Sequence, residues 1–401
     1  MIRCAQGKNL AWLHQDMCEK YSDGFVVGID ATNLRRGGGV THLIEILSAT
    51  QPENHSITKV VVWGGGQTLA KLKDQDWLEK GNPAALNRGL FSRIWWQRFS
   101  LSRAALATGC NVLLIPGGNY TGSFRPIVTM SQNLLPFEWR ELHRYGVTFT
   151  SLKLILLRFI QSRSFRGADG VIFLTKYARK AVLNVTGELS GKTAIFPHGI
   201  SVRFQMKPRV QFPIKDYNES KPYRLIYVSI IDQYKHQWYV VEAVHALRAR
   251  GFPLVLELVG PAYPPSLILL KSAIKRFDPD ENWVHYCGSV SYDALHKMYA
   301  EADVGIFASS CENLPIILLE TMAAGLPIAC SNCGPMPEVL GDAGVYFNPE
   351  NPVELEDAIH KLIISPELRS EKSKASFKKS QQYTWRSCAE QTFGFLRNIN
   401  D

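Results

Sequence analysis

Long apolar runs are absent from this sequence. Every unbroken hydrophobic stretch in its 401 residues is far shorter than the ~18 residues that a membrane-spanning helix needs. The first twenty residues, MIRCAQGKNLAWLHQDMCEK, contain acids and no continuous apolar core, which argues against a secretory signal peptide. With 46% hydrophobic and 20% charged residues, the composition is that of a soluble globular protein with room for two domains.

Paired cysteine motifs are also scarce. Eight cysteines are scattered along the chain, and a CxxC spacing occurs once, at Cys330 and Cys333. A structural zinc site of four ligands would need a second pair. We therefore expect free thiols and a reducing, cytoplasmic compartment.

Acidic residues are scarce in the first half. Residues 1–200 hold 24 Lys+Arg against 13 Asp+Glu, a net charge of +11, whereas residues 201–401 hold 21 against 23, a net charge of −2. The excess is strongest in residues 88–192, with 15 Lys+Arg against 4 Asp+Glu. A basic half predicts an anionic partner, and nucleic acid, an acidic membrane and a phosphorylated lipid all qualify.

Strand-like apolar runs alternate with helical patterns, such as HQWYVVEAVHALRAR and SYDALHKMYAEAD, through both halves. This alternation predicts an α/β protein with two parallel-sheet domains. The expected strands are Phe25–Asp30, Lys59–Trp63, Asn111–Ile115, Pro126–Met130, Gly170–Leu174, Thr193–Phe196, Tyr223–Ser229, Leu254–Val259, Trp283–Tyr286, Val304–Ala308, Pro327–Cys330 and Val345–Phe347.

The polar segment 201–222 contains three prolines and has no regular period, as expected of a join between domains. We therefore expect one domain at residues 1–200 and a second at residues 201–382. The terminal helix, within residues 383–401, is expected to pack back on the first domain.

The stretch ENLPIILLE sets two acids, Glu312 and Glu320, on either side of an expected helix start. Asn313 is a favoured N-cap, and Pro315 is favoured in a first turn, so the helix should begin at Leu314 and Pro315. The free N–H groups of a helix start suit a phosphate, and carboxylates suit sugar hydroxyls. From the residues alone, a solvated loop acid and a tolerated polar side chain on an amphipathic helix remain the alternative.

This E-x7-E pattern, followed by TMAAGLPIACSNCGPMPEVLGDAGVYFNP, resembles the nucleotide-sugar glycosyltransferases of family 4. Shorter pieces follow the same order: GID and Gly37–Gly39, then FPHGIS, YVSIIDQYKHQWYVVEA and YCGSV. The resemblance implies the GT-B fold, in which two Rossmann-like domains face each other across a cleft. The wording is most similar to bacterial enzymes that assemble O-antigen, a part of lipopolysaccharide, and other surface polysaccharides.

The resemblance also implies roles for individual residues. Glu320 would accept hydrogen bonds from the donor ribose, and Glu312 would hold hydroxyls of the transferred sugar. Lys235 would neutralise the departing diphosphate, where an ammonium stabilises developing charge. The other donor-binding positions that it implies are Asn313, Leu314, Pro315, Ile316, Gly38, Gly39, Gln132 and Ser229.

Two of the departures from the family pattern bear directly on the chemistry. Ile230 stands where an arginine is usual, so one cation is missing or is supplied by His236 or another residue. Gln132 stands where many members have a histidine; its amide can bind a sugar but cannot act as a base. Retaining members need no strong enzymic base, because the leaving phosphate can take the acceptor proton. These departures leave an inactive homologue open.

Two short motifs, DQD at Asp74–Asp76 and DPD at Asp278–Asp280, have the spacing of a metal-binding pair. Both lie in charged stretches that flank expected helices rather than after core strands. The resemblance implies a metal-independent enzyme that needs no cofactor, with a GDP- or UDP-linked sugar as its substrate.

The stretch SLKLILLRFIQSRSFRGAD combines aliphatic residues with Lys153, Arg158, Arg163 and Arg166. A basic amphipathic helix of this kind can lie on an anionic membrane. A core helix with a solvated basic face explains the same residues equally well.

The function expected from these features is a retaining hexosyltransferase, with mannose as the first sugar to consider. It would extend a lipid-linked or oligosaccharide acceptor in the bacterial cytoplasm, peripherally at the inner face of the membrane. A nucleotide-sugar epimerase of the same architecture and a non-catalytic, basic membrane- or nucleic-acid-binding homologue are the alternatives. We expect no nucleic-acid partner, because aromatic residues are interleaved with basic ones only around Trp95 and Trp96.

Overall fold

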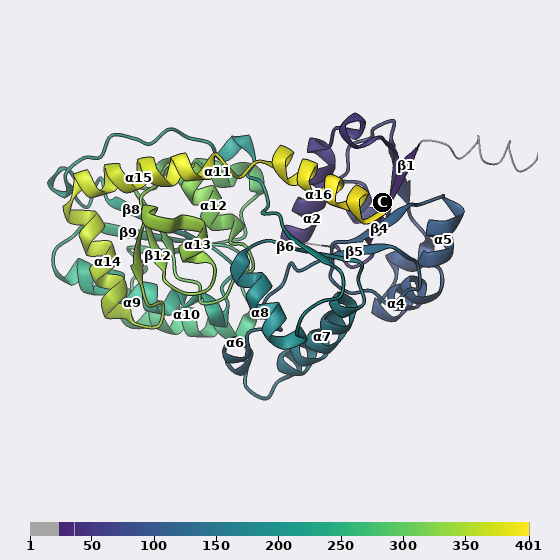
Figure 1. Ribbon diagram of the computed structural model, residues 1–401. Coiled ribbons are helices and arrows are strands. Elements are labelled where there is room, and N and C mark those ends of the chain that lie inside the picture. The colour runs from purple at the N-terminus through teal and green to yellow at the C-terminus, as the bar shows by residue number, and fades with distance from the viewer. Residues whose placement is uncertain (1–23, 36, 401) are drawn as a thin grey trace, which may run out of the picture. The chain divides into compact units, whose positions relative to one another are not determined.

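The computed structural model describes residues 24–35 and 37–400 and contains two β-sheets (Figure 1). The first sheet has the order β3-β2-β1-β4-β5-β6-β7 and the second the order β10-β9-β8-β11-β12-β13. The strands of the first sheet are β1 (Phe25–Ala31), β2 (Ile57–Gly64), β3 (Leu78–Gly81), β4 (Val112–Ile115), β5 (Ile127–Met130), β6 (Gly170–Phe173) and β7 (Lys192–Ile195). Those of the second are β8 (Tyr223–Val228), β9 (Leu254–Val259), β10 (Val284–Gly288), β11 (Val304–Phe307), β12 (Ile328–Ser331) and β13 (Gly344–Phe347).

Helices connect these strands, as parallel pairing requires. In the first part of the chain they are α2 (Gly38–Ala49), α3 (Gly66–Leu69), α4 (Leu90–Phe99), α5 (Leu101–Ala107), α6 (Trp139–His143), α7 (Phe149–Arg166) and α8 (Lys176–Thr186). The later ones are α9 (Gln237–Ala249), α10 (Pro264–Phe277), α11 (Tyr292–Glu301), α12 (Ile316–Ala323), α13 (Met336–Leu340), α14 (Pro352–Ile364), α15 (Pro366–Ser380) and α16 (Trp385–Asn400). Short 3-10 turns are η1 (Pro52–His55), η2 (Ala84–Asn87), η3 (Val202–Phe204), η4 (Ile214–Asp216), η5 (Gln233–Lys235) and η6 (Gly341–Ala343).

The twelve strands expected from apolar runs are all present, with ends that differ by at most two residues. Central strands such as β4 and β11 are buried at every position, because helices cover both faces of a parallel sheet. The sequence analysis missed β3, whose sequence Leu-Glu-Lys-Gly is short and polar. It lies at the end of the first sheet, where it pairs in parallel with β2 alone.

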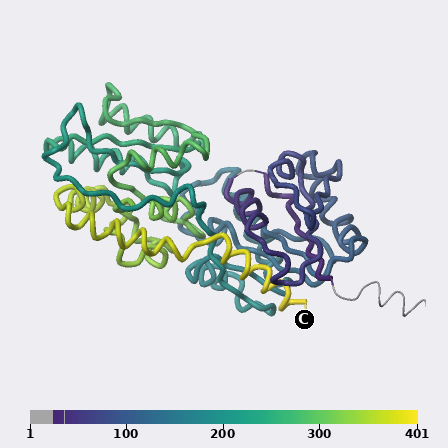
Figure 2. Tube along the Cα trace, turned by 90° about the horizontal axis from the view of Figure 1, so that it is seen from above, coloured from purple at the N-terminus to yellow at the C-terminus, as the bar shows by residue number. Residues whose placement is uncertain are grey.

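Contacts between residues divide the chain into two compact units. The first unit contains residues up to Met130, then Ala168–Gly170 and Ala389–Asp401; the second contains Ser131–Gly167 and Val171–Cys388. The end of α16, yellow in Figures 1 and 2, belongs to the first unit. There the Arg397 guanidinium lies 5.1 Å from the centre of the Phe25 ring. The predicted domain limits at residues 200 and 382 stay a prediction.

No helix in the described part of the chain is long and apolar enough to cross a membrane. The cysteines that the structure describes, six in number, are all free thiols, and Cys330 is fully buried in β12 while Cys333 is half-buried beyond it.

Candidate functional site

The candidate site is built on the loop between β11 and α12. The helix begins at Ile316 and not, as predicted, at Leu314, so the assignment of Asn313 as its N-cap is wrong. The Asn313 side chain instead donates from Nδ2 to the Ser131 hydroxyl at 3.1 Å. The backbone carbonyl of Asn313 accepts from the Thr175 hydroxyl at 2.9 Å. These bonds tether the loop at Asn313, where the chain bends before the helix starts.

Lys235 and Glu312 form a direct ion pair. Lys235 ends η5, which follows β8, and Glu312 follows β11. Since β8 and β11 are neighbours at the point where the strand order reverses, both loops leave the same edge of the sheet, where ligands bind in open α/β folds. The side chains are 7% and 16% exposed. The pair is therefore mostly desolvated, and each charge depends on the other or on a ligand.

Aromatic rings hold the ammonium of Lys235 in place. Its Nζ lies 4.9 Å from the centre of the Tyr234 ring and 5.5 Å from that of Phe307. The Tyr227 hydroxyl donates to the Lys235 carbonyl at 3.0 Å. The lysine is thus buried and held in a fixed position beside Glu312.

A small pocket opens beside this pair. Its lining includes four polar or charged residues, namely Gln132, Asn133, Glu312 and Asn313, and is completed by Leu134, Leu135, Tyr234 and Cys311. The Asn313 side-chain oxygen is buried and accepts no hydrogen bond within the described residues. Buried acceptors are nearly always satisfied in folded proteins, so this oxygen is suited to a ligand hydroxyl. The structure thus brings Gln132, Glu312 and Asn313 together.

Glu320 lies on α12, one turn after its start, and is 2% exposed. Burial raises the pKa of its carboxyl from 4.5 to about 8, while the hydroxyls of Tyr292 and Tyr299 and the charge of Arg203 oppose the rise. From the sequence alone, Glu320 could be a polar residue that an amphipathic helix tolerates. In the structure it is a buried carboxyl whose pKa is strongly raised. Such groups gather at functional sites.

The sequence analysis missed a polar network next to the pocket. The Arg144 guanidinium bridges Glu141 at 2.7 Å and Glu350 at 2.8 Å. The Ser310 hydroxyl donates to Glu141 at 2.7 Å and lies 3.0 Å from His236 Nε2. This network ties the segment around α6 to the loops that carry Lys235 and Glu312. The pair Glu141–Arg144 was visible in the sequence as an i,i+3 helix pair, but its partners were not.

His236 was the candidate for the cation missing at Ile230. Burial, with a smaller effect of Arg144, lowers the pKa of the imidazole from 6.5 to about 4, so the ring is neutral near pH 7. The residue adopts a left-handed backbone conformation, with φ of 54°, at the start of α9. Without a bound anion the ring therefore brings no positive charge to the site, and its role as a substitute cation stays a prediction.

Ser229, another predicted donor-binding residue, is buried. Its hydroxyl donates to the Ile230 carbonyl at 2.8 Å and accepts from the Gln237 side chain at 3.2 Å. The chain passes very close at this point, since a Cβ on Gly260, whose φ is 144°, would lie 2.2 Å from the Ser229 carbonyl oxygen. Ser229 therefore supports the loop through bonds within the protein.

The remaining predicted positions differ in their surroundings. Leu314 and Pro315 are buried. The Ile316 N–H donates to the Leu314 carbonyl at 3.0 Å, so this N–H already has a hydrogen-bond partner within the protein. Gly38 and Gly39 belong to the first compact unit, where they form the first turn of α2. The other predicted site residues belong to the second unit.

One aspartate of each DxD-like motif has partners within the protein. The Asp278 carboxylate accepts from the backbone N–H groups of Asn282, Trp283 and Val284 at 2.8 to 3.0 Å. Asp74 pairs with Lys80 at 2.5 Å. Asp278 thus ends α10 and positions β10, which is a structural role.

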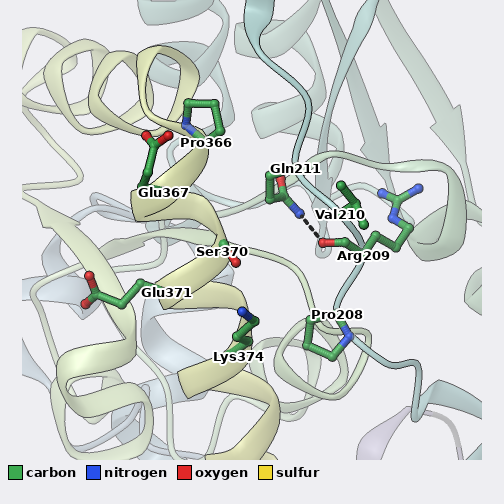
Figure 3. Close-up of a pocket in the computed structure, with 9 residues that line it drawn as sticks. All are labelled: Pro208, Arg209, Val210, Gln211, Pro366, Glu367, Ser370, Glu371 and Lys374. Carbon is green, nitrogen blue, oxygen red and sulfur yellow. Dashed lines mark hydrogen bonds between the residues drawn. The ribbon is translucent and has the colours of Figure 1, made fainter.

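A wider hollow, of about 650 Å³ against about 130 Å³ for the pocket beside Glu312, lies between α15 and the segment 208–211 (Figure 3). In Figure 3 the Gln211 side chain points to the Arg209 carbonyl, to which it donates at 3.1 Å. Nearby, the buried Arg369 donates to Gln211 and to the carbonyls of Leu362 and Ile363. The guanidinium of Arg369 thus attaches the segment 208–211 to α15, so the residues around this hollow have a structural role.

Known structures and sequences resemble this chain to different extents. Sucrose-phosphate synthase from Thermosynechococcus elongatus superposes with a TM-score of 0.72 at 15% identity, over 94% of this chain and 99% of that one. With the two parallel sheets, this confirms the fold class, two Rossmann-like domains of the GT-B type.

Among sequences, O-antigen chain mannosyltransferase B of Escherichia coli is 30% identical over 112 residues, which are 28% of this chain and 29% of that protein. A GDP-mannose-dependent alpha-(1-6)-phosphatidylinositol monomannoside mannosyltransferase of Mycobacterium tuberculosis is 26% identical over 253 residues, 60% of this chain and 64% of that one. This chain thus covers less than two thirds of either relative. Residues 211–379, which carry Lys235, Glu312 and Glu320, match the family described as glycosyl transferases group 1.

Proposed function

We propose that this protein is a retaining, metal-independent glycosyltransferase that moves a hexose, mannose first among them, from a GDP- or UDP-linked donor. The acceptor is a lipid-linked or oligosaccharide chain of a bacterial surface polysaccharide such as O-antigen. It meets that acceptor peripherally at the cytoplasmic face of an anionic membrane. The match of residues 211–379 and the names of the two mannosyltransferases support the transferase part.

The observation that carries this proposal is the desolvated Lys235–Glu312 pair beside a polar pocket, with the buried Glu320 on the following helix. A lysine that is 7% exposed and held by two aromatic rings offers a fixed positive charge at the edge of the sheet. A diphosphate of charge −2 competes well for that ammonium. Glu312 is then released to accept hydrogen bonds from sugar hydroxyls.

Each residue then has a defined task. Lys235 stabilises the charge that grows on the leaving diphosphate, and its fixed position means that little reorganisation is needed. Asn313 offers a buried amide oxygen to a sugar hydroxyl, and Gln132, which lines the same pocket, offers its amide. Glu320 offers its carboxyl oxygens as acceptors to the ribose hydroxyls.

The transfer step balances without an enzymic base. The bond between the anomeric carbon and the phosphate oxygen breaks, and a bond from the acceptor oxygen forms on the same face of the sugar. The acceptor proton passes to the departing phosphate oxygen. A buried, neutral His236 fits this scheme, since the step asks it for no proton.

The test is a thermal-shift screen of the purified protein against GDP-mannose, UDP-hexoses, the free nucleotides and free mannose. A ligand that binds the native state stabilises it by about 1.4 kcal/mol for each tenfold excess over Kd. We expect a nucleotide sugar to raise Tm, and Lys235→Met to abolish the rise. The matched control is Glu371→Gln, which alters an acid in the wider hollow beside α15 and should leave the rise unchanged.

Product analysis decides the rest of the proposal. Incubation of the stabilising nucleotide sugar with a saccharide acceptor should give a glycoside that retains the donor's anomeric configuration. Interconversion of the nucleotide sugar without an acceptor would establish the epimerase instead. If no nucleotide sugar shifts Tm, the proposed function is wrong.

A further inference from the structure

Helix α7 carries an apolar stripe on its outward face. The stripe consists of Phe149, Leu152, Leu156 and Phe159, which are 82%, 63%, 57% and 70% exposed. The spacing of three, four and three residues puts these side chains on one face of the helix. Single exposed apolar residues are common, but four in a row on one helix face form a contiguous patch that is typical of an interaction site.

The covered face of α7 is mixed, because polar side chains are buried there beside Leu154 and Phe165. Ser151, Gln161, Ser162 and Ser164 are all at most 6% exposed. The Ser151 hydroxyl donates to the Gly146 carbonyl at 2.5 Å and the Ser164 hydroxyl to the Ile160 carbonyl at 2.9 Å, whereas the Ser162 hydroxyl has no hydrogen-bond partner within the described residues. The usual pattern, with apolar residues inside and polar residues outside, is therefore partly reversed in this helix. Burial within the chain does not explain the stripe.

The charge of α7 indicates the nature of its partner. The helix contains four basic residues and no acid. Lys153 and Arg163 are exposed, and the described residues offer their side chains no ion pair or hydrogen bond. Arg158 and Arg166, by contrast, have partners within the protein. Arg158 donates to the Pro136 carbonyl at 3.3 Å and lies over the Trp139 ring, and Arg166 donates to the Thr186 carbonyl at 2.9 Å.

Exposed apolar residues continue beyond the helix start. Val147 is fully exposed, and the Trp139 ring is 52% exposed in α6. Tryptophan is favoured where an apolar phase meets water. Apolar side chains flanked by uncompensated cations, with an aromatic residue at the margin, are the features of a helix that lies in a membrane interface.

We infer that the outward face of α7 docks on an anionic lipid membrane. The stripe enters the boundary of the acyl chains, and Lys153 and Arg163 contact the phosphates of the headgroups. A second copy of this chain is a poorer occupant, because a two-fold contact would place two cationic helices against each other. This inference deepens the proposed function by naming the surface on which the enzyme meets its acceptor.

The experiment is flotation of the full-length protein with vesicles of phosphatidylcholine alone or with phosphatidylglycerol. The double variant Leu152→Ser with Phe159→Ser should weaken binding to anionic vesicles at least about tenfold, since it removes two apolar anchors. The matched control is Val353→Ser with Ile364→Ser on α14, where the side chains are 63% and 53% exposed. It should bind as wild type does.

Charge and salt separate the two parts of the contact. Lys153→Gln with Arg163→Gln should reduce binding to anionic vesicles and flatten its dependence on salt, because exposed charges are screened beyond ~8 Å at physiological ionic strength. Arg158 and Arg166 are left in place, since their bonds within the protein would confound a fourfold variant. Transfer to a lipid-linked acceptor should slow in both double variants, and transfer to a soluble acceptor should not.

The inference fails if wild type ignores anionic vesicles, or if the serine variant binds them as wild type does. A dimer in sedimentation that this variant dissociates, without vesicle binding, would assign the stripe to a second copy. Thermal shift by nucleotide sugars is the independent readout and should be unchanged in all α7 variants. Vesicle binding without any such shift would sustain the membrane contact and reject the transferase.

Discussion

Glutamine in place of Glu320 should change how the stability of this protein depends on pH. The pKa of the buried carboxyl is raised from 4.5 to about 8, so the native state holds a proton that the unfolded chain releases. The contribution of Glu320 to stability is therefore complete below pH 4.5 and is lost progressively as the pH rises toward 8. The neutral amide of Glu320→Gln has no such dependence.

The size of the effect follows from the two pKa values. Each unit of difference corresponds to about 1.4 kcal/mol between the protonation states. With 4.5 in the unfolded chain and about 8 in the native state, wild type should lose about 2 kcal/mol relative to the variant between pH 5.5 and pH 7. A further loss of about 1 kcal/mol should follow by pH 8, where the native carboxyl is half ionised.

The assay is urea unfolding of wild type and Glu320→Gln at several pH values from 5.5 to 8. Groups other than Glu320 cancel in the difference of the two unfolding free energies. Glu350→Gln is the matched control, because hydrogen bonds from Arg144 lower the pKa of Glu350 and move its titration below this window. A wild-type-minus-Glu320→Gln difference that stays flat with pH would refute the argument, since it would mean that the native carboxyl is already ionised.

Further predictions concern the pocket, the metal and the fold. Glu320→Ala should weaken donor binding, whereas Glu312→Ala should mainly lower turnover, by about a hundredfold, as expected for a contact that strengthens in the transition state. Donor titration and steady-state kinetics of both variants check this. Wild-type values in either variant would contradict the role proposed for that residue. Addition of EDTA should leave transfer unchanged, because in the proposed function Lys235 stabilises the leaving diphosphate in place of a divalent ion; activity lost and then restored by Mg²⁺ or Mn²⁺ would reject this. Arg369→Met should lower the free energy of unfolding by about 3 kcal/mol or more, because it leaves buried carbonyl groups without a hydrogen-bond donor. Urea unfolding measures the loss, with a substitution at an exposed position, Arg276→Met, as the control. A loss below about 1 kcal/mol would show that water replaces the guanidinium.

Local patterns were enough to predict the secondary structure of this chain. Apolar runs predicted twelve strands, because each central strand of a parallel sheet is buried on both faces and must be apolar throughout. The edge strand β3 escaped, since pairing on one side leaves its side chains free to be polar. The start of α12 was also predicted wrongly, because the Asn313 side chain bonds to Ser131, 182 positions away in the sequence, and not to the helix.

The composition of the candidate site was visible in the sequence, and its assembly was not. The types and spacing of Glu312 and Glu320 predicted two carboxylates near a helix start. That Lys235 pairs with Glu312, 77 positions later, was decided by the adjacency of β8 and β11 at the reversal of strand order. The raised pKa of Glu320 and the lowered pKa of His236 were likewise decided by burial, which depends on every element packed around them.

By itself, the sequence determined the alternation of strands and helices, the basic first half and the two acids that flank a helix start. Those properties depend only on the chemistry of the side chains and on the spacing of apolar residues at intervals of two to four positions. The tertiary structure decided which charges meet, which acid is stripped of water and which face of α7 stays uncovered. A helical period shows that a face is apolar, but whether the rest of the chain covers that face depends on long-range packing.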